Sequence, residues 1–303
     1  QSMNIGQFVA AEIIILLVMT SVEKLILSLE TIYDILTGIE KLGQVTDMPL
    51  EHEDGVDAIE RIKTEGMEVT LENVNFSFPG QKNKTLNGLS LQLNESDKVL
   101  ITGQNVSGRS TLLQVLAGLY EIQEGGITYN QLPVDNIEMG SLRSIIGDCL
   151  SQERLFHGSL YDNITMGRPR ATLENVQWVV HEFGLEHYIR SLPKGYDTIL
   201  GPQGEHLPRS IVQKLMLARS VVDKPKLLLL EDVFEHLGEE DNRKIIDFVT
   251  DPANKWTLVA VSNDPYLAQK CNRVVIMDQG KVTHDGDYES LKTIANFNTN
   301  GHA

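Results

Sequence analysis

The sequence contains little cysteine and little positive charge. Its two cysteines, Cys149 and Cys271, lie far apart without a CxxC spacing, which predicts two reduced thiols in a cytosolic domain. Lysine and arginine together number 26 against 42 acidic residues, so the formal net charge is −16. Because a nucleic-acid-binding surface usually shows a basic stripe, this balance argues against a nucleic-acid partner. It does not exclude one bound nucleotide, because phosphate sites are local and built largely from backbone N–H groups.

One long hydrophobic run is present, and it lies at the N-terminus. Residues 4–27 are strongly apolar, and residues 5–22 contain a single charge, Glu12. That length is at the short limit for a membrane-spanning helix. The run has no basic n-region and no small-residue cleavage site, which excludes a signal peptide. A buried core helix or an amphipathic coiled-coil segment is the alternative.

The apolar pattern continues at helical spacing through residues 21–42, so the two parts together predict one long helix that leaves a membrane and enters the cytosol. A lone spanning helix that begins at residue 4 also suggests that the rest of a membrane domain is missing from this sequence. Residues 46–66 are polar and acidic and contain Pro49, which is typical of a linker.

From residue 67 onward the sequence predicts strands and helices in turn. Residues 67–78 alternate apolar and polar side chains at period two, which indicates a half-buried strand. Two short apolar runs, 226–230 and 256–262, suit buried parallel strands. The other expected elements are strands within 85–103, a helix at about 110–118, mostly helical sequence over 159–222 and a hairpin over 273–286.

Residues 103–111, GQNVSGRST, have the outline of a phosphate-binding loop between a strand and a helix. In the pattern G-x-x-x-x-G-K-[ST], Gly103 and Gly108 have the required spacing, Ser110 follows, and Arg109 replaces the lysine. Such a loop needs backbone N–H groups aimed at phosphates, a cation over the β and γ oxygens and a hydroxyl for Mg²⁺. Arginine keeps the charge on a broad planar group. Taken alone, the match also fits a glycine turn before a helix.

A second motif favours the nucleotide site. Residues 227–232, LLLLED, read as an apolar strand that ends in two carboxylates, Glu231 and Asp232. Carboxylates at a strand end beside a phosphate loop hold Mg²⁺ and polarise water in nucleotide hydrolysis. The two motifs together therefore predict a P-loop nucleotide site.

These motifs resemble those of a known family, the nucleotide-binding domains of exporter-type ABC transporters. The resemblance covers about residues 67–290, and residues 4–50 are similar to the last transmembrane helix of an exporter half with its cytosolic extension. The landmarks of the family occur in its order. They are the aromatic NFSF (75–78), the phosphate loop (103–111), the glutamine loop (150–156), the helix after it (159–167), the signature loop and helix (201–222), the carboxylate strand (227–232), the D-loop (235–238) and the switch position (260–264).

The resemblance implies an α/β fold: a P-loop NTPase core of the ABC ATPase type with an antiparallel β subdomain and a helical subdomain at about 153–222. The implied domains are the last transmembrane helix and its cytosolic extension (1–45), a linker (46–66) and the nucleotide-binding domain (67–303). It also implies ATP and Mg²⁺ as cofactors and a second nucleotide-binding domain as partner. The full-length protein is expected to be multi-pass in a bacterial inner (cytoplasmic) membrane, with this domain in the cytosol. The substrate class points only loosely to peptides, bacteriocins or proteins.

The resemblance also assigns binding roles to residues that this sequence retains. Phe78 is expected to stack on the adenine, with an ordinary strand aromatic as the alternative. Gln152 is expected to contact Mg²⁺ or water, with a solvated loop residue as the alternative; Ser110 and Glu231 are the other implied metal ligands. The implied phosphate cradle consists of Gly103, Asn105, Ser107, Gly108, Arg109, Ser110 and Thr111.

Catalytic positions depart from the family pattern. Val106 stands where glycine is usual, and because a β-branched residue disfavours positive φ, we expect the loop to avoid that conformation or to shift. Glu231 occupies the Mg²⁺ aspartate position, and Asp232 occupies the catalytic glutamate position, where it stops short by about 1.5 Å. A general base must reach its water, so this change alone is expected to be severe. Asn263 replaces the switch histidine and cannot titrate.

The signature loop departs as well. The family's LSGGQ, whose serine and glycines bind the γ-phosphate of the opposite subunit, is replaced by Leu207, Pro208, Arg209, Ser210 and Ile211. Pro208 has neither a hydroxyl nor an N–H, but it suits the first position of a helix, so we expect the fold to tolerate it.

Two functions fit these residues. The first is an exporter subunit whose nucleotide-binding domain is catalytically degenerate, binds ATP weakly or statically and acts through dimerisation. The second is an active, homodimeric ATP-hydrolysing exporter. Because loss of general-base function alone costs about 10²–10⁴ in rate, five altered positions in one reaction centre favour the first. A soluble ABC protein without a transport role is disfavoured by the apolar run at residues 4–27.

Overall fold

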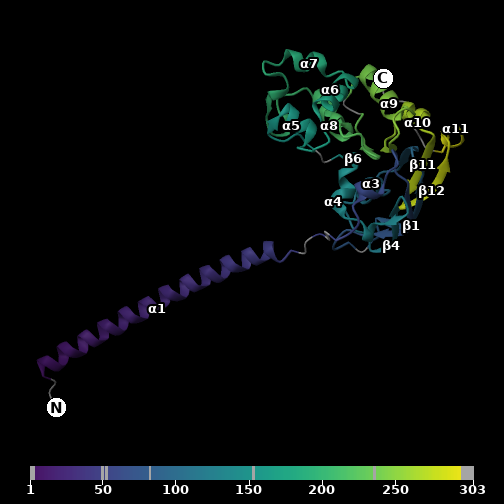
Figure 1. Cartoon of the computed structure of the whole chain (residues 1–303). Coiled ribbons are helices and arrows are strands. Elements are labelled where there is room, and N and C mark those ends of the chain that lie inside the picture. The colour runs from purple at the N-terminus through teal and green to yellow at the C-terminus, as the bar shows by residue number, and fades with distance from the viewer. Residues whose placement is uncertain are drawn as a thin grey trace. The chain divides into compact units, whose positions relative to one another are not determined.

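The computed structural model describes residues 4–48, 51, 54–81, 83–151, 154–234 and 237–294. The chain divides into two compact units, one up to residue 51 and one from residue 52 onward (Figure 1). The first unit is a single long helix. The second unit is an α/β assembly that contains every sequence motif of the predicted nucleotide site.

The first unit is helix α1 (Ile5–Thr46), and none of its residues is buried. Its 42 residues correspond to a length of about 63 Å. The helix is long and apolar enough to cross a membrane by length and composition. The predicted single helix through residues 5–42 is confirmed.

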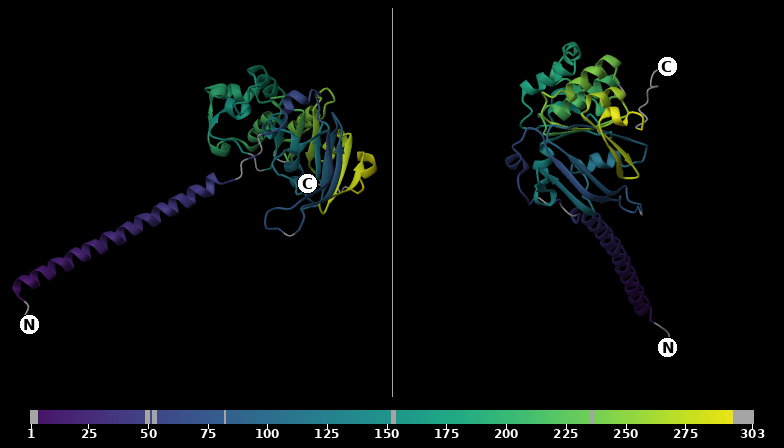
Figure 2. Two further views of the ribbon diagram at one scale, coloured as in Figure 1. Left: turned by 60° about the horizontal axis from the view of Figure 1, so that its bottom comes forward. Right: turned by 90° about the vertical axis from the view of Figure 1, so that its right-hand side faces the viewer.

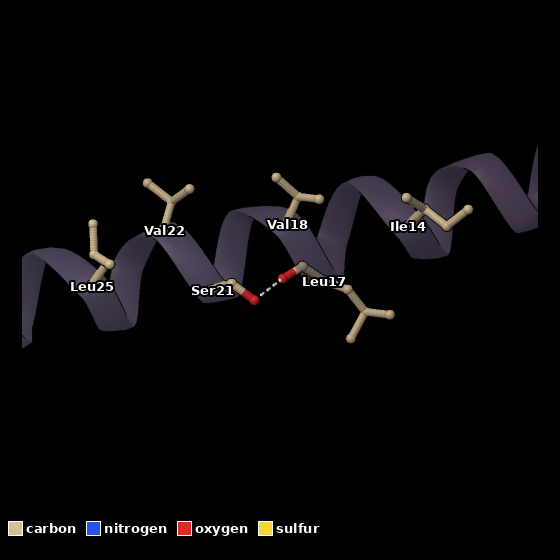
Figure 3. Close-up of a pocket in the computed structure, with 6 residues that line it drawn as sticks. All are labelled: Ile14, Leu17, Val18, Ser21, Val22 and Leu25. Atoms are coloured by element: carbon tan, nitrogen blue, oxygen red, sulfur yellow. Dashed lines mark hydrogen bonds between the residues drawn. The ribbon is translucent and has the colours of Figure 1, made fainter.

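One face of α1 carries an apolar stripe (Figure 3). The stripe residues recur at intervals of three or four, which places them on the same side of a helix. The hydroxyl of Ser21, the polar member, donates to the carbonyl oxygen of Leu17 at 2.7 Å. The stripe therefore presents hydrocarbon along its length. It consists of Ile14, Leu17, Val18, Ser21, Val22 and Leu25.

The second unit is built on a six-stranded sheet of order β12-β11-β3-β10-β9-β6. All neighbours in it are parallel except β11 and β12, which form the expected antiparallel hairpin. Its central strands are buried, which explains their continuous apolar sequences. The strands are β3 (Lys98–Gly103), β6 (Ile146–Cys149), β9 (Leu227–Glu231), β10 (Thr257–Val261), β11 (Arg273–Asp278) and β12 (Lys281–Gly286).

A second, antiparallel sheet has the order β2-β1-β4-β5. Its buried side chains form one apolar cluster with helix α3 (Arg109–Leu116) and with one face of the six-stranded sheet. This arrangement fixes α3, and with it the loop that precedes α3, between the two sheets. The strands are β1 (Val69–Phe76), β2 (Leu86–Leu93), β4 (Glu124–Tyr129) and β5 (Leu132–Pro133).

The other face of the large sheet packs against a second apolar cluster formed with the later helices. Figure 1 shows α5 to α8 grouped together and α9 to α11 beside the carboxy-terminal strands, and Figure 2 shows the same unit from two other directions. These helices are α5 (Leu160–Thr165), α6 (Leu173–Glu182), α7 (Glu186–Ser191), α8 (Arg209–Val221), α9 (Glu239–Thr250), α10 (Pro265–Lys270) and α11 (Tyr288–Leu291).

The remaining elements are short. A two-stranded sheet, β7 (Gly158–Ser159) with β8 (Ile199–Leu200), flanks the helical group. Buried Arg219 of α8 donates to the backbone and side-chain oxygens of Asn163 in α5 at 2.8 and 3.1 Å, which joins the two helices. The other helices are α2 (Ala58–Arg61) and α4 (Met139–Ser144), with 3-10 turns at Val134–Asn136, Gly195–Asp197 and Pro202–Gly204.

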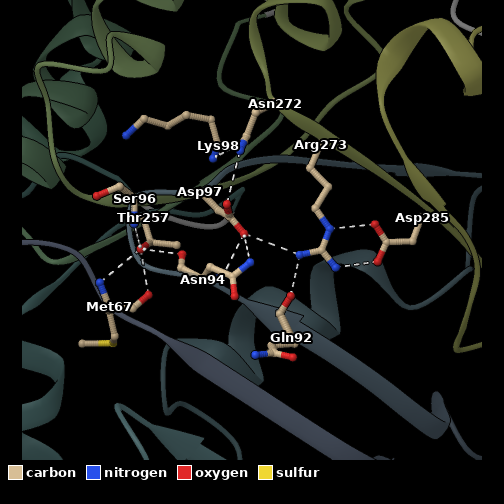
Figure 4. Close-up of polar contacts among 10 residues, drawn as sticks. All are labelled: Met67, Gln92, Asn94, Ser96, Asp97, Lys98, Thr257, Asn272, Arg273 and Asp285. Carbon is tan, nitrogen blue, oxygen red and sulfur yellow. Dashed lines mark hydrogen bonds and ion pairs between the residues drawn. The ribbon is translucent and has the colours of Figure 1, made fainter.

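Polar contacts gather where β3, β10 and β11 begin (Figure 4). The Thr257 hydroxyl oxygen accepts from the backbone N–H of Met67 at 3.1 Å and of Ser96 at 3.0 Å. The Arg273 guanidinium donates to both carboxylate oxygens of Asp285. These contacts occupy the amino-terminal edge of the parallel strands. The carboxyl ends, including the phosphate loop, therefore lie at the opposite edge, where ligands of open α/β sheets bind.

Candidate nucleotide site

The phosphate loop joins the end of β3 to the start of α3. Two positions in it require glycine. Gly103 has φ 150°, and a Cβ there would collide with the carbonyl oxygen of Met277. Gly108, the N-cap of α3, has φ 93°, and a Cβ there would lie 2.8 Å from the carbonyl oxygen of Thr85. The glycine spacing read from the sequence thus reflects a tightly wrapped turn before a helix.

Val106 differs from the sequence-based expectation. We expected the loop to avoid positive φ at this residue or to shift, but Val106 adopts φ 68° and its side chain is 98% exposed. A β-branched residue in this region is strained by about 1–3 kcal/mol. The neighbouring contacts impose the conformation, because Ser107 donates to the Gln104 carbonyl at 3.3 Å and accepts from the Gly280 N–H at 3.0 Å. The loop keeps its wrapped shape and stores strain at its tip.

The loop offers hydrogen-bond donors that the protein itself does not use. The hydroxyl of Ser107 is buried and has no hydrogen-bond partner in the described part of the chain. The N–H groups of Arg109, Ser110 and Thr111 have no partner within the helix, because the first helical bond runs from the Leu112 N–H to the Gly108 carbonyl. These N–H groups form the positive end of the helix dipole. Ser110 beside them is exposed, and Thr111 is buried. This set of donors fits a phosphate group.

The arginine of the loop and the switch position lie together. Asn263 Oδ1 accepts from Thr102 Oγ1 at 2.8 Å and from Arg109 Nη1 at 3.5 Å. The second distance is at the long limit of a hydrogen bond. Thr102 belongs to β3, Arg109 begins α3 and Asn263 follows β10, so these three elements meet here. The contact places the charge of Arg109 at the edge of the loop.

The two strand-end carboxylates have different surroundings. Glu231 is 4% exposed, and its Oε2 accepts from the backbone N–H of Ser151 at 3.0 Å, so the carboxylate bridges from β9 to the segment after β6. Asp232 is exposed and has φ 47°. Its backbone N–H donates to the Val261 carbonyl at 3.0 Å. Gln152, the expected metal or water contact, lies outside the described residues.

The residues fit a magnesium ion that a nucleotide would carry. Mg²⁺ takes oxygen ligands, keeps several waters and is often bound by one or two protein groups plus substrate phosphates. Ser110 and Glu231 supply one hydroxyl and one carboxylate of this kind. Among the described residues, no group of three histidine, cysteine or acidic side chains could hold a metal ion alone. Such an ion would neutralise phosphate charge, and Ser110 and Glu231 stay the predicted residues for holding it.

Phe78 belongs to a cluster of three aromatic rings. It lies two residues beyond β1, so it is not a residue within that strand. Its ring meets those of Phe76 and Tyr120 edge to face, with centroids 5.1 and 5.5 Å apart. No sequence motif marks Tyr120, because its place beside Phe78 depends on how β1 packs against the segment after α3. The cluster is a surface on which a purine could stack.

The signature segment lies at the start of α8. The sequence predicted Pro208 at the first helical position, but it is the N-cap, with φ −56° and ψ 138°, and Arg209 is the first helical residue. The carbonyl oxygen of Pro208 accepts from the N–H groups of Ile211 and Val212 at 2.9 and 3.1 Å. Leu207 donates to Gly204 at 2.8 Å. Across the described ranges, no hydrogen bond or ion pair joins this segment to the phosphate loop of the same chain.

A cavity of about 550 Å³ adjoins the phosphate loop. Of its lining, only the loop residues and Asn263 belong to sequence motifs. The strand and hairpin residues around it carried no sequence signal, since the register of β11 against β3 brings them there. Its polar lining consists of Gln104, Asn105, Asn263, Asp278, Thr283 and His284.

A loop bounded by two glycines between a parallel strand and a helix, with carboxylates at the end of another strand, defines a P-loop nucleotide-binding domain. Residues 86–235 match the family described as ABC transporter. The chain belongs to that family, and its second unit is an ABC nucleotide-binding domain of the exporter type.

Similar proteins include two bacterial ones. The chain is 27% identical over 288 residues to the alpha-hemolysin translocation ATP-binding protein HlyB of Escherichia coli O157:H7, covering 95% of this chain and 40% of HlyB. It is 29% identical over 240 residues to the putative multidrug export ATP-binding/permease protein YgaD of Bacillus subtilis, covering 76% of this chain and 41% of YgaD. The chain thus spans about two fifths of the length of these curated relatives.

A solved structure shares the fold. The structure of a bacterial Atm1-family ABC exporter with ATP bound has a TM-score of 0.77 to this chain at 23% identity, and the likeness covers 88% of this chain and 46% of that one. The ABC ATPase fold with a long preceding helix, predicted from the sequence, is confirmed.

Proposed function

We propose that the chain is the nucleotide-binding part of an ABC exporter whose site binds ATP with Mg²⁺ weakly and hydrolyses it poorly. One contrast carries the proposal. The loop retains glycine-only turns and a buried, unpartnered Ser107 hydroxyl, which suit a phosphate. The metal position and the switch position are instead bonded within the chain: Glu231 to the Ser151 N–H, and Asn263 to Arg109 and Thr102.

The chemistry supports impaired hydrolysis. A general base must lie within hydrogen-bond reach of the water it activates. Asp232 is one methylene shorter than glutamate, a deficit of about 1.5 Å. Asn263 cannot take up or release a proton and carries no charge. In this site the chain's own residues would bind and orient the phosphates through the loop N–H groups and Arg109, while proton removal from water lacks a well-placed acceptor.

Transport would depend on a second nucleotide-binding domain. We propose that α1 spans the inner membrane of a bacterium and that the α/β unit lies in the cytosol. The apolar stripe and the lack of any buried residue in α1 support a lipid or helix-bundle environment. Support for a bacterial exporter comes from HlyB and YgaD, whose names describe translocation and export.

Calorimetric titration of the full chain in detergent micelles tests nucleotide binding. We expect saturable binding of ATP with Mg²⁺ at high micromolar to millimolar concentration, since Val106 holds strain at the loop tip and the broad Arg109 group replaces the compact charge of lysine. A flat titration at millimolar ATP would leave a domain with a purely structural role. Steady hydrolysis by the unpartnered chain would instead support an active homodimeric exporter.

A further inference from the structure

The first turn of α9 contacts two functional segments at once. Asp241 Oδ2 lies 2.7 Å from Lys214 Nζ of α8, the helix that begins with the signature segment. The next residue, Asn242, donates from Nδ2 to Asp264 Oδ2 at 3.1 Å. Asp264 directly follows the switch position Asn263. One helical turn therefore joins the signature helix to the switch loop.

The contact to α8 is firmly held. Lys214 is 6% exposed, and its ion pair with Asp241 is the charged contact that compensates its burial. A buried charge that loses its partner is strongly unfavourable. The pair therefore fixes the separation of α8 and α9 at a point five residues beyond Arg209.

The contact to the switch loop has a cost that stability alone does not explain. Asp264 Oδ1 caps α10 by accepting from the N–H groups of Tyr266 and Leu267, so Oδ2 is the oxygen that meets Asn242. The other end of the Asn242 amide, Oδ1, is buried without a partner in the described part of the chain. A buried, unpaired polar atom is unfavourable. An apolar residue would avoid that cost, which indicates a role for the amide donor itself.

From the switch loop the connection reaches Arg109 of the phosphate loop. Asn263 Oδ1 accepts from Arg109 Nη1 at 3.5 Å and from Thr102 at 2.8 Å. Because Asp264 directly follows Asn263, a displacement of Asp264 would also move the oxygen that Arg109 contacts.

We propose that Asp241 and Asn242 form a clamp that holds the signature helix and the switch position in one register, and that both act as positioning residues for Arg109. The ligand side of this proposal rests on the proposed nucleotide binding; the clamp itself exists without nucleotide. Through this clamp, a contact made to the exposed start of α8 would change how Arg109 binds the γ-phosphate.

Hydrogen exchange of the nucleotide-free full chain in detergent micelles tests the clamp. Lys214→Met removes the buried charge while keeping an apolar stem of similar length. We expect the backbone amides of residues 262–270 to exchange about tenfold faster in this variant, because the switch segment opens locally more often. Lys214 itself contacts α9 and not this segment, so the effect would pass through the clamp. Asn242→Leu, which removes the unpaired oxygen and preserves volume, should have the same effect.

Glu239→Gln is the matched control. It breaks an exposed ion pair with Arg243, 2.7 Å long, on the same turn of α9, and should leave exchange at 262–270 unchanged. Exchange in Lys214→Met equal to that of the control would overturn the clamp.

Nucleotide discrimination tests the effect on Arg109. Fluorescent ATP and ADP analogues give the ratio of the dissociation constant for ADP to the dissociation constant for ATP. Asn242→Leu should lower this ratio as much as Arg109→Ala does, and the double variant should lower it no further. A structural defect would weaken both nucleotides equally, so an unchanged ratio would contradict the positioning role. If the unaltered chain binds neither analogue, the proposed function fails, and the exchange result alone decides the clamp.

Discussion

Within the phosphate loop, shape and charge are supplied by different residues. Gly103 and Gly108 allow the chain to wrap, because a side chain at either would meet backbone atoms. Arg109 supplies the cation, with its guanidinium near Asn263 rather than at the centre of the loop. A residue change can therefore separate the two contributions.

Arg109→Ala is expected to weaken ATP binding about tenfold or more and ADP binding less. Hydrogen bonds to charged groups contribute about 1.5–3 kcal/mol, and the γ-phosphate is the group that ADP lacks. Calorimetry of the full chain measures both affinities. Arg109→Lys is the matched control and should bind ATP at least as tightly as the unaltered chain. Equal loss for ATP and ADP would show that Arg109 does not reach the γ-phosphate.

Cys271 should make stability depend on alkaline pH. Burial raises the pKa of its thiol from 9.0 to about 12, so the folded chain holds this proton where the unfolded chain releases it. The resulting stability is fully present below pH 9 and declines as pH rises toward 12. From pH 9 to 10 the loss is about 1 kcal/mol for one such group.

Denaturant unfolding of the α/β unit at pH 8, 9 and 10 checks this expectation. The Cys271→Ala variant should lose less stability over that range than the unaltered chain. Lys98, whose pKa burial lowers to about 8, affects both proteins, so the comparison removes most of its contribution. Identical pH profiles would show that the thiol titrates normally.

Among the elements, α1 depends most on surroundings that the chain alone does not supply. Glu12 lies within its apolar span, and its side chain is exposed. An ionisable group in a membrane span usually faces a bundle interior or a water-filled path. We therefore expect Glu12 to avoid lipid.

Cysteine labelling at position 12 in the intact transporter tests the orientation. Glu12→Cys should react with an aqueous maleimide or cross-link to a neighbouring helix. Ile14→Cys, on the apolar stripe, is the comparison position and should prefer a lipid-soluble reagent. Reaction of position 12 with the lipid-soluble reagent alone would contradict the prediction.

Elements with strong local patterns were predictable from the sequence, and contacts between elements were not. The apolar runs 226–230 and 256–262 became buried parallel strands because local hydrophobicity determined their burial. The positive φ of Val106 was not predictable, since backbone contacts from a distant hairpin impose it. The bond from Ser151 to Glu231 likewise depends on the pairing of β6 with β9. The sequence located the glycine turns of the phosphate loop, and tertiary contacts determine the conformation of the residues between them.

At the scale of the assembled transporter, the defects would be shared between two composite sites. In the family arrangement each nucleotide lies between one domain's phosphate loop and the other's signature loop. With an unaltered partner, one site would combine this chain's carboxylates with a sound signature. The other would combine a sound phosphate loop and glutamate with Pro208 and Arg209. Only the second retains a full-length catalytic carboxylate, so we expect residual turnover there, with Arg209 supplying a cation to the γ-phosphate.

Two repairs in the partnered transporter separate the sites. Pro208→Ser with Arg209→Gly should raise turnover, because it restores the signature that completes the working site. Asp232→Glu with Asn263→His should raise turnover less. A strong increase from the carboxylate repair with none from the signature repair would show that the working site is the other composite site.

The central claim is that this chain binds ATP without hydrolysing it efficiently. Steady-state ATP hydrolysis by the full chain in nanodiscs, at an ATP concentration that calorimetry shows to be saturating, tests it most directly. We predict turnover at the background of an Arg109→Ala, Asp232→Ala variant despite saturable binding. Turnover of about 1 s⁻¹ or more, in the ordinary range of enzymes, abolished in that variant, would contradict the account and establish an active ATPase.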